Sequence, residues 1–550
     1  MTEQHFRHRS GRLSPLVVFA FVVALLAGLP VASVGFNLFL GGTSATWSHL
    51  ASTVLFEYVL NSLALCAGVG LGVAIIGIAT AWLTAMHDFP GRRIFEWALV
   101  LPLAVPAYVM AYVYTDFLQF VGPLQTALRD FFEWRRGDYY FPDIRTLPGA
   151  MLMFVFVLYP YVYLLARTAF LERAGGVLEA SRTLGIGPWR AFFTVSLPLA
   201  RPAIAAGVAL ALMETLADYG TVAYFAVNTF TTGIYRAWFS LGDRVASAQL
   251  AAMLLGFVLL LVAMERITRG RARYHNTSNR HRPPPGRLKG GAGLLAMLTC
   301  LLPLCLGFLL PAALLLRMAL GEGDTQFGER FLMLARNSFT LAGLTALIAV
   351  ALAVLLAYSA RLSKTLLSKG LNRLVGLGYA VPGTVIAVGV LIPVTRLDNW
   401  LSGQWEAWFG SNPGLLLTGG IAALIYAYLV RFLAVALQTV EASLSKITPS
   451  MDDAARSMGL GQGQTLRRVH VPILRGSLFT ASLLVFVDVM KELPATLVMR
   501  PFNFDTLATQ AYVLASDERL TEASTAALAI VAVGLLPLIA LSRQISRSRR

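Results

Sequence analysis

Long apolar stretches separated by short polar ones run along almost the whole chain. A helix needs ~20 apolar residues to cross a hydrocarbon core of ~30 Å, and its backbone is then fully paired within the segment. About twelve stretches approach that length. They predict membrane-spanning helices near residues 15–39, 60–84, 96–120, 148–170, 202–226, 246–267, 293–319, 338–361, 374–394, 414–438, 475–499 and 523–542.

Residues 269–290 interrupt this pattern between the sixth and seventh stretches. They are rich in Arg, Asn, Ser and Pro, with Pro283-Pro284-Pro285 near the centre. That composition is typical of a solvated linker.

The two sides of the linker repeat each other. Asn61-Ser62 recurs as Asn337-Ser338, and Ala104-Val105-Pro106 recurs as Ala380-Val381-Pro382, at an offset of about 276 residues. We therefore predict an all-α polytopic membrane protein made of two tandem six-helix halves in parallel orientation. Its predicted parts are a first half at residues 1–268, a cytoplasmic linker at 269–290 and a second half at 291–550.

Composition supports the membrane assignment. Hydrophobic residues make up 57% of the chain and charged residues only 13%, against roughly 25% charged residues in soluble domains. The net charge of +16 is spread over short basic runs between apolar stretches. This is the positive-inside pattern, so it predicts cytoplasmic N- and C-termini and a bilayer around the chain, and it argues against a nucleic-acid partner.

Two polar loops carry the same pattern of an acidic residue, Ala, a Gly and a later Pro. The loops lie near residues 176–198 and 450–472, and their spacings are identical. In each, we expect a short helix that ends at the Gly in the left-handed conformation. The first is expected after Gly176, and the second is expected to begin with a capping box at residues 450–453. The loop residues that we single out are Glu179, Ala180, Gly185 and Pro198, then Asp453, Ala454, Gly459 and Pro472.

Both loops resemble the EAA loop of binding-protein-dependent ABC importer permeases. The resemblance implies that they dock on two copies of a cytoplasmic ABC ATPase, and that a periplasmic substrate-binding protein delivers the solute. The chain contains no Gly-Lys dipeptide, which a P-loop requires. We therefore expect a transporter subunit without catalytic residues or a bound cofactor, with ATP used by the separate ATPase.

Four carboxylates lie within apolar stretches, where ionisable residues are costly and usually face a cavity or a partner. Glu214 and Asp218 are four residues apart, on one face of a helix, and Asp488 and Glu492 repeat this spacing at an offset of 274 residues. They predict a translocation path whose hard oxygen ligands suit a metal cation. Alternatively, Lys491 pairs with Asp488, or the carboxylates form structural hydrogen bonds. No metal ligand set is assigned.

Other polar side chains of the apolar stretches are open to two readings. Tyr108, Tyr112, Tyr159 and Tyr163 either line the path or anchor the chain at the membrane interface. Arg167 and Arg431 are expected to extend toward the interface, and we assign them no role.

Residues 218–222 and 233–235, with residues 489–496 and 502–508, resemble the fused permeases of bacterial ferric-iron importers. This resemblance implies a multi-pass protein of the bacterial inner membrane that moves Fe(III) from periplasm to cytoplasm by ATP-driven alternating access. Permeases for thiamine, sulfate, polyamine and phosphonate share the architecture and stay as alternatives. A secondary transporter with twelve helices in two repeats is a remote one.

Overall fold

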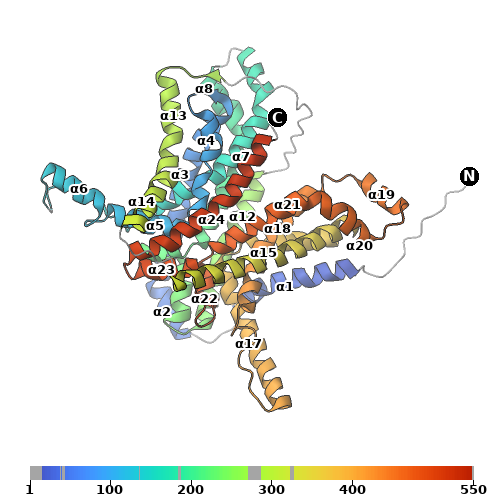
Figure 1. The fold of residues 1–550 in the computed structure, drawn as a ribbon. Helices are drawn as coiled ribbons and strands as arrows, with labels where there is room; N and C mark the ends of the chain where they lie inside the picture. The colour runs from blue at the N-terminus through green and yellow to red at the C-terminus, as the bar shows by residue number, and fades with distance from the viewer. Residues whose placement is uncertain are drawn as a thin grey trace, which may run out of the picture.

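The computed structural model describes residues 15–37, 39, 44–135, 137–183, 187–269, 286–321, 328–363 and 365–547. Within these ranges the protein is almost entirely helical (Figure 1). Among the described residues, eleven helices are long and apolar enough to cross a membrane, or twelve if a pair bent by 90° is one span. This confirms the all-α polytopic architecture. The predicted boundaries of the halves and linker stay predictions, and residues 270–285 of the linker lie outside the described residues.

The helices of the first half recur in nearly the same order in the second half. Its helices are α1 (Pro15–Asn37), α2 (Ser44–Thr53), α3 (Leu55–Met86), α4 (Arg92–Ala98), α5 (Ala107–Leu118), α6 (Pro123–Phe132), α7 (Leu147–Thr183), α8 (Pro188–Ala191), α9 (Leu197–Ala217), α10 (Gly220–Tyr224), α11 (Phe230–Phe239) and α12 (Arg244–Arg269). A 3₁₀ turn, η1 (Leu101–Ala104), precedes α5, and a π-helical turn, η2 (Phe192–Ser196), precedes α9.

The second half comprises α13 (Gly291–Leu304), α14 (Leu310–Gly321), α15 (Glu329–Ser363), α16 (Leu366–Gly376), α17 (Gly383–Phe409), α18 (Ala422–Leu444), α19 (Pro449–Ser457), α20 (Gln462–Thr465), α21 (Val471–Met490), α22 (Pro494–Met499), α23 (Leu507–Ser516) and α24 (Leu520–Arg547). Its irregular turns are η3 (Cys305–Leu309), η4 (Gly378–Ala380) and η5 (Leu466–His470). Two short strands, β1 (His87–Asp88) and β2 (Gly286–Arg287), pair in parallel and join the end of α3 to the segment before α13.

Four of the predicted straight spans are interrupted. Val105-Pro106 separates η1 from α5, and Val381-Pro382 separates η4 from α17. Each Pro begins a new helix, since its ring fixes φ and it has no N–H to donate back. The fifth span breaks after Ala217, and the eleventh breaks after Met490. Apolar length predicted a span in each of these regions, but the observed spans Trp189–Ala217, Gly383–Phe409 and Gln462–Met490 have shifted bounds, because length does not reveal a break in the backbone.

The tenth span also begins later than predicted, because the segment ahead of α18 is not helical. Asp398 of α17 is fully buried and accepts backbone N–H groups from Leu416, Leu417 and Thr418, together with the Thr418 hydroxyl. These bonds satisfy the backbone groups of the segment without a helix. The C-terminal part of α17 projects away from the bundle, as does α6 on another side (Figure 1).

The halves exchange their first helices. Helix α1 packs against α15, α16 and α17 of the second half, whereas α13 and η3 pack against α3, α4 and α7 of the first. Two hydrogen bonds anchor α1 to its new neighbours: Ser359 Oγ donates to the Leu16 carbonyl at 3.1 Å, and Tyr426 Oη donates to the Leu26 carbonyl at 2.6 Å. The two halves are therefore intertwined.

The α1–α17 crossing depends on a glycine. A Cβ added at Gly389 would lie 2.4 Å from the Pro30 carbonyl oxygen, so the two backbones approach as small residues allow in membrane helix packing. Gly389→Val is expected to destabilise the protein by about 1–3 kcal/mol through overpacking and to lower its thermal unfolding midpoint in detergent. Gly343→Val on α15 is the control, because nothing lies within 4 Å of a Cβ there. Equal midpoints would contradict the tight crossing.

Candidate functional site

Three of the four interruptions line one cavity of about 110 Å³ between the halves, and Tyr379 of η4, just ahead of the fourth, lines it as well. It is large enough for several water molecules, each of which needs about 10–15 Å³ on this measure. All four predicted carboxylates line it: Glu214, Asp218, Asp488 and Glu492. Residues 105–107 and 492–494, which belong to two of the breaks, line it as well. Irregular backbone within a membrane protein is tolerated where it borders such a cavity.

Two of the carboxylates cap short helices beyond the breaks. Asp218 accepts the backbone N–H of Thr221 at 2.8 Å and the Thr221 hydroxyl at 3.1 Å. Glu492 accepts the N–H groups of Ala495 at 2.9 Å and Thr496 at 3.0 Å, and the Thr496 hydroxyl at 2.6 Å. The acidic side chains thereby supply acceptors for orphan donors of α10 and α22. Asp218 and Glu492 therefore form the structural hydrogen bonds that the sequence analysis considered as an alternative.

The other two carboxylates face basic side chains. Lys491 Nζ lies 3.0 Å from Asp488 Oδ1, which confirms the pairing considered from the sequence. Arg431 lies between two acids, with Nη2 3.6 Å from Glu214 Oε2 and Nη1 3.6 Å from Glu492 Oε1. The expectation that Arg431 extends to the membrane interface is wrong. The residue is buried in the cavity wall, because the surrounding carboxylates compensate its charge there.

Arg167 is also paired inside the protein. Its Nη2 lies 3.3 Å from Glu96 Oε1, and both side chains are largely buried. No group of three or more His, Cys, Asp or Glu side chains among the described residues is arranged to hold a metal ion. The four carboxylates therefore line a cavity without forming a closed coordination site.

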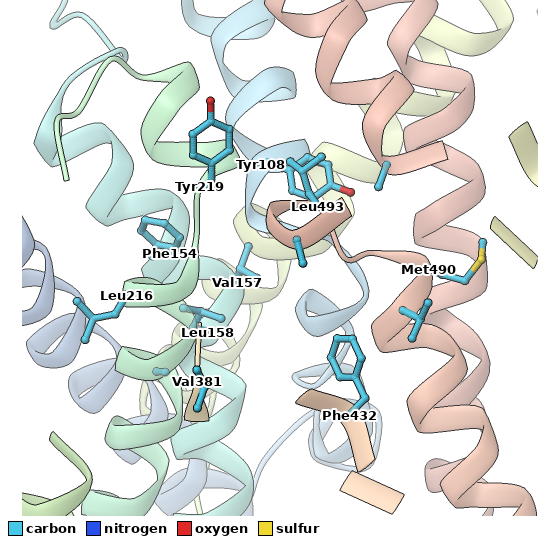
Figure 2. Close-up of a cluster of buried hydrophobic side chains, with 14 of the residues drawn as sticks. Tyr108, Phe154, Val157, Leu158, Leu216, Tyr219, Val381, Phe432, Met490 and Leu493 are labelled. Atoms are coloured by element: carbon cyan, nitrogen blue, oxygen red, sulfur yellow. The ribbon is translucent and has the colours of Figure 1, made fainter. Parts of the chain in front are cut away.

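Aromatic and aliphatic side chains from both halves complete the wall (Figure 2). Of the four tyrosines considered either as path-lining residues or as interface anchors, Tyr108 borders this cavity, and its buried hydroxyl has no hydrogen-bond partner in the described structure. Tyr112 borders a separate small pocket, and Tyr163 Oη donates to the Glu96 carbonyl at 3.0 Å. Sequence reasoning missed Tyr161 and Tyr379, which line the cavity from α7 and η4.

The cavity adjoins a larger one on the side of the repeated loops. The second cavity, of about 410 Å³, shares Tyr161, Tyr379, Asp488 and Lys491 with the first. It is also lined by Leu210 and Met213 of α9 and Leu484 and Val487 of α21. These positions precede the carboxylates along helices that start at the loops, so the second cavity extends toward the loops.

On the opposite side the two breaks pack tightly together. A Cβ added at Gly220 would lie 2.7 Å from Leu493 Cδ2 and 2.7 Å from Tyr108 Cβ. Tyr108 and Leu493 lie next to each other in Figure 2. Because Gly220 begins α10 and Leu493 immediately precedes α22, the two halves touch here through the backbone of one and the side chain of the other. We call Tyr108, Gly220 and Leu493 the closed contact.

The second repeated loop has most of the predicted features. Gly459 has φ +78°, the left-handed conformation expected of a residue that ends a helix. Asp453 is exposed and pairs with Arg456, and Pro472 lies in the first turn of α21 after the π-helical turn η5. The predicted capping box is wrong: Thr448 is the N-cap and Pro449 the first helical residue, without a side-chain cap bond.

The first loop differs in its backbone. Helix α7 continues through Gly176 to Thr183, so the predicted separate helix is part of a longer one. Glu179 and Ala180 lie in this extension, whereas Gly185 lies outside the described residues. Pro188 begins α8, and Pro198 lies in the first turn of α9 directly after η2, as Pro472 does after η5.

A polar clamp that sequence reasoning missed holds the second loop. Asp452 Oδ2 accepts from Arg361 Nη2 and Nε at 2.8 and 2.9 Å. Asp452 Oδ1 lies 2.6 Å from His470 Nε2. Arg361 also donates to the carbonyls of Leu444 and Ile447 at 2.9 and 3.0 Å. The equivalent positions of the first loop hold Leu178 and Ser196. The clamp therefore distinguishes the two loops.

Asp452→Asn is expected to loosen the second loop, because each hydrogen bond to a charged partner contributes about 1.5–3 kcal/mol. The measurement is the rate of limited proteolysis within residues 449–470 of the purified chain, which should rise several-fold. Asp453→Asn is the matched control, since its exposed ion pair is worth about 0–1 kcal/mol. Equal cleavage of both variants would show that the clamp does not order the loop.

Comparison with known proteins adds independent observations. Residues 74–274 and 349–550 match a family model described as the binding-protein-dependent transport system inner membrane component. The Fe(3+)-transport system permease protein FbpB 2 of Haemophilus influenzae is 27% identical over 495 residues, which cover 88% of this chain and 90% of that protein.

Two further relatives differ in length and name. The ferric transport system permease protein FbpB of Actinobacillus pleuropneumoniae is 22% identical over 527 residues, which cover 91% of this chain and 72% of that protein. The molybdenum transport system permease protein ModB of Escherichia coli is 32% identical over 213 residues, which cover 36% of this chain and 87% of that protein. The family match thus occurs twice, and the two iron-named relatives extend across both copies.

Proposed function

Because the chain belongs to the family of binding-protein-dependent transport system inner membrane components, we propose that it is the membrane subunit of an ABC importer that carries Fe(III) into the cytoplasm. The observation that carries the iron assignment is the cavity between the halves. Four carboxylates and two basic side chains line it, which leaves two negative formal charges in excess. A cavity of that sign favours a cation over an oxyanion.

The names of the long relatives support the same cargo, since both iron permeases align across most of this chain. Carboxylate oxygens are hard ligands suited to highly charged cations. Because those of Asp218 and Glu492 are already hydrogen-bonded, the cavity would hold a passing ion weakly. Weak binding suits a path, because an ion must also leave it.

The proposed cycle uses partners outside this chain. Two copies of a cytoplasmic ABC ATPase would bind the repeated loops, through Glu179, Ala180, Gly185 and Pro198 in one and Asp453, Ala454, Gly459 and Pro472 in the other. A periplasmic substrate-binding protein would deliver the cargo at the opposite side. In this cycle the loops and both termini would lie in the cytoplasm and the chain in the bacterial inner membrane. Closure of the ATPases would then move the halves between two states of access.

An oxyanion is the second candidate cargo. The molybdenum permease relative aligns with 36% of this chain, and the cavity holds two cationic side chains, Arg431 and Lys491. Both are paired with carboxylates, so an oxyanion would have to displace an acidic partner. Fe(III) would meet Glu214 at its partly accessible side, beside Arg431, which Glu492 also compensates.

The test is uptake of radioactive Fe(III) by iron-starved cells with and without this chain, with molybdate, sulfate and thiamine measured in parallel. Iron uptake that needs the chain and stops on ATP depletion is the expected result. Loss of molybdate, sulfate or thiamine uptake with unchanged iron uptake would overturn the iron assignment and keep the importer class. Uptake that persists after ATP depletion would indicate a secondary transporter.

A further inference from the structure

We infer that Arg431 is a latch between the two halves: it bridges Glu214 and Glu492 while the closed contact is made, and it releases Glu214 when the halves separate. The inference rests on the importer class of the chain and not on the identity of the cargo. It assigns Arg431 a positioning role in the transport cycle.

The three side chains of the latch come from both halves of the chain. Glu214 belongs to α9 of the first half, whereas Arg431 lies on α18 and Glu492 just before α22 of the second. The Arg431–Glu214 pair therefore crosses between halves, while the Arg431–Glu492 pair lies within one half. A second inter-half ion pair, Arg145–Glu518, has an exposed acid and a distance of 3.8 Å. The pair at Arg431 is the more buried of the two.

The bridge between Arg431 and its two acids is loosely held. Both distances from Arg431 to its acids are 3.6 Å, longer than a hydrogen bond between charged groups of about 2.7–2.9 Å. The Arg431 Nε atom is buried and has no hydrogen-bond partner in the described part of the chain. The guanidinium is thus held by charge without a fixed bidentate geometry, so it can keep one acid while it loses the other.

Release of Glu214 from Arg431 costs less than release of Glu492 would. Removing one partner of a buried ion pair is strongly unfavourable when it leaves a charge without compensation. Arg431 avoids this, because Glu492 would stay beside it after the halves separate. Glu214 is 27% exposed in its side chain against 1% for Glu492, so water in the cavity can solvate the released acid. Arg431 can therefore release Glu214 of the first half but not Glu492 of its own half.

The latch is joined to the closed contact through the adjacent residues Glu492 and Leu493. Glu492 caps α22 and directly precedes Leu493, which packs against Gly220 and Tyr108. A Cβ added at Gly383 would lie 2.7 Å from Glu492 Oε1 and 3.2 Å from Arg431 Nη1, so the pair is confined against the start of α17. Arg431, Glu492 and Leu493 consequently form one packed unit. The Glu214 contact holds this unit against the first half.

The test is the ATPase rate of the complete transporter in lipid nanodiscs without the binding protein. If the latch stabilises the resting state, Glu214→Gln should raise this unstimulated rate about fivefold or more, the lower end of typical coupling effects. Glu518→Gln is the matched control, because it removes the exposed inter-half pair by the same chemical change and should leave the rate unaltered. Glu214→Asp, which keeps the charge but shortens the side chain, should give an intermediate rise.

Unstimulated rates of Glu214→Gln and Glu214→Asp equal to the wild-type rate would overturn the latch. A rise of the same size in Glu518→Gln would also overturn it, because any inter-half pair would then have the effect. Thermal unfolding of each complex shows whether a variant is folded, and Glu214→Asp keeps the test decisive should Glu214→Gln not assemble. Iron is absent from this assay, so failure of the latch and failure of the iron assignment are separate results.

Discussion

Glu492→Ala is expected to cause the largest loss of stability among substitutions in the cavity, about 3–5 kcal/mol, the range for breaking a buried ion pair from one side. Glu492 is buried and accepts bonds from the Ala495 and Thr496 N–H groups and the Thr496 hydroxyl. Alanine leaves these donors without their acceptor. It also leaves Arg431 with Glu214 alone.

The measurement is the folded yield after membrane extraction together with the thermal unfolding midpoint. Glu214→Gln is the comparison variant, since it removes one 3.6 Å ion pair from a partly accessible position, and its midpoint should fall much less. A Glu492→Ala protein with wild-type yield and midpoint would show that the cap on α22 is dispensable.

Gly459→Val is expected to give the largest loss of coupling, a fall in ATP-driven uptake of about tenfold. Its φ of +78° is unfavourable for an L-residue by about 1–2 kcal/mol, and a β-branched side chain is the worst case. A Cβ at this position meets nothing within 4 Å. The backbone conformation is therefore the cause of the effect, and a new path of the chain would displace α19 from α20.

Uptake and co-purification of the partner ATPase are the two measurements for Gly459→Val. Gly461→Val is the matched control: its Cβ also meets nothing within 4 Å, but its φ is −70°, which valine readily adopts. Wild-type uptake by Gly459→Val, or an equal loss in both variants, would contradict a role for the left-handed turn.

The repeated spacing of the acids allowed the cavity to be predicted in outline. Two residues four apart on a helix share a face, and a duplication places the second pair opposite the first. The structure brings Glu214, Asp218, Asp488 and Glu492 to one cavity as that logic requires. The roles of the individual acids did not follow, because capping depends on where the helix breaks. Apolar stretches of ordinary length conceal the breaks after Ala217 and Met490.

Arg431 shows why the rest of the site was missed. A lone arginine in an apolar stretch is usually near an interface, and only its contacts with Glu214, more than two hundred residues away, place it in the cavity. The clamp on the second loop is similar, because Arg361 is distant in sequence from Asp452 and His470. No local periodicity carries such information. The one signal of such residues in the sequence is a charged residue in one repeat whose counterpart in the other repeat is uncharged.

Local patterns in the chain establish the membrane class, the duplication and the two repeated loops, because hydrophobic length, internal repetition and the left-handed preference of glycine are properties of local segments. Contacts between distant segments were needed to establish that α1 and α13 exchange partners between the halves, that three of the broken spans border a shared cavity, and that Arg431 joins Glu214 to Glu492. The physical reason is that an apolar helix is equally well buried by lipid or by any neighbouring helix. Close packing at glycines such as Gly389 and Gly220 and compensation of buried charge select one arrangement, and both depend on residues far apart in the chain.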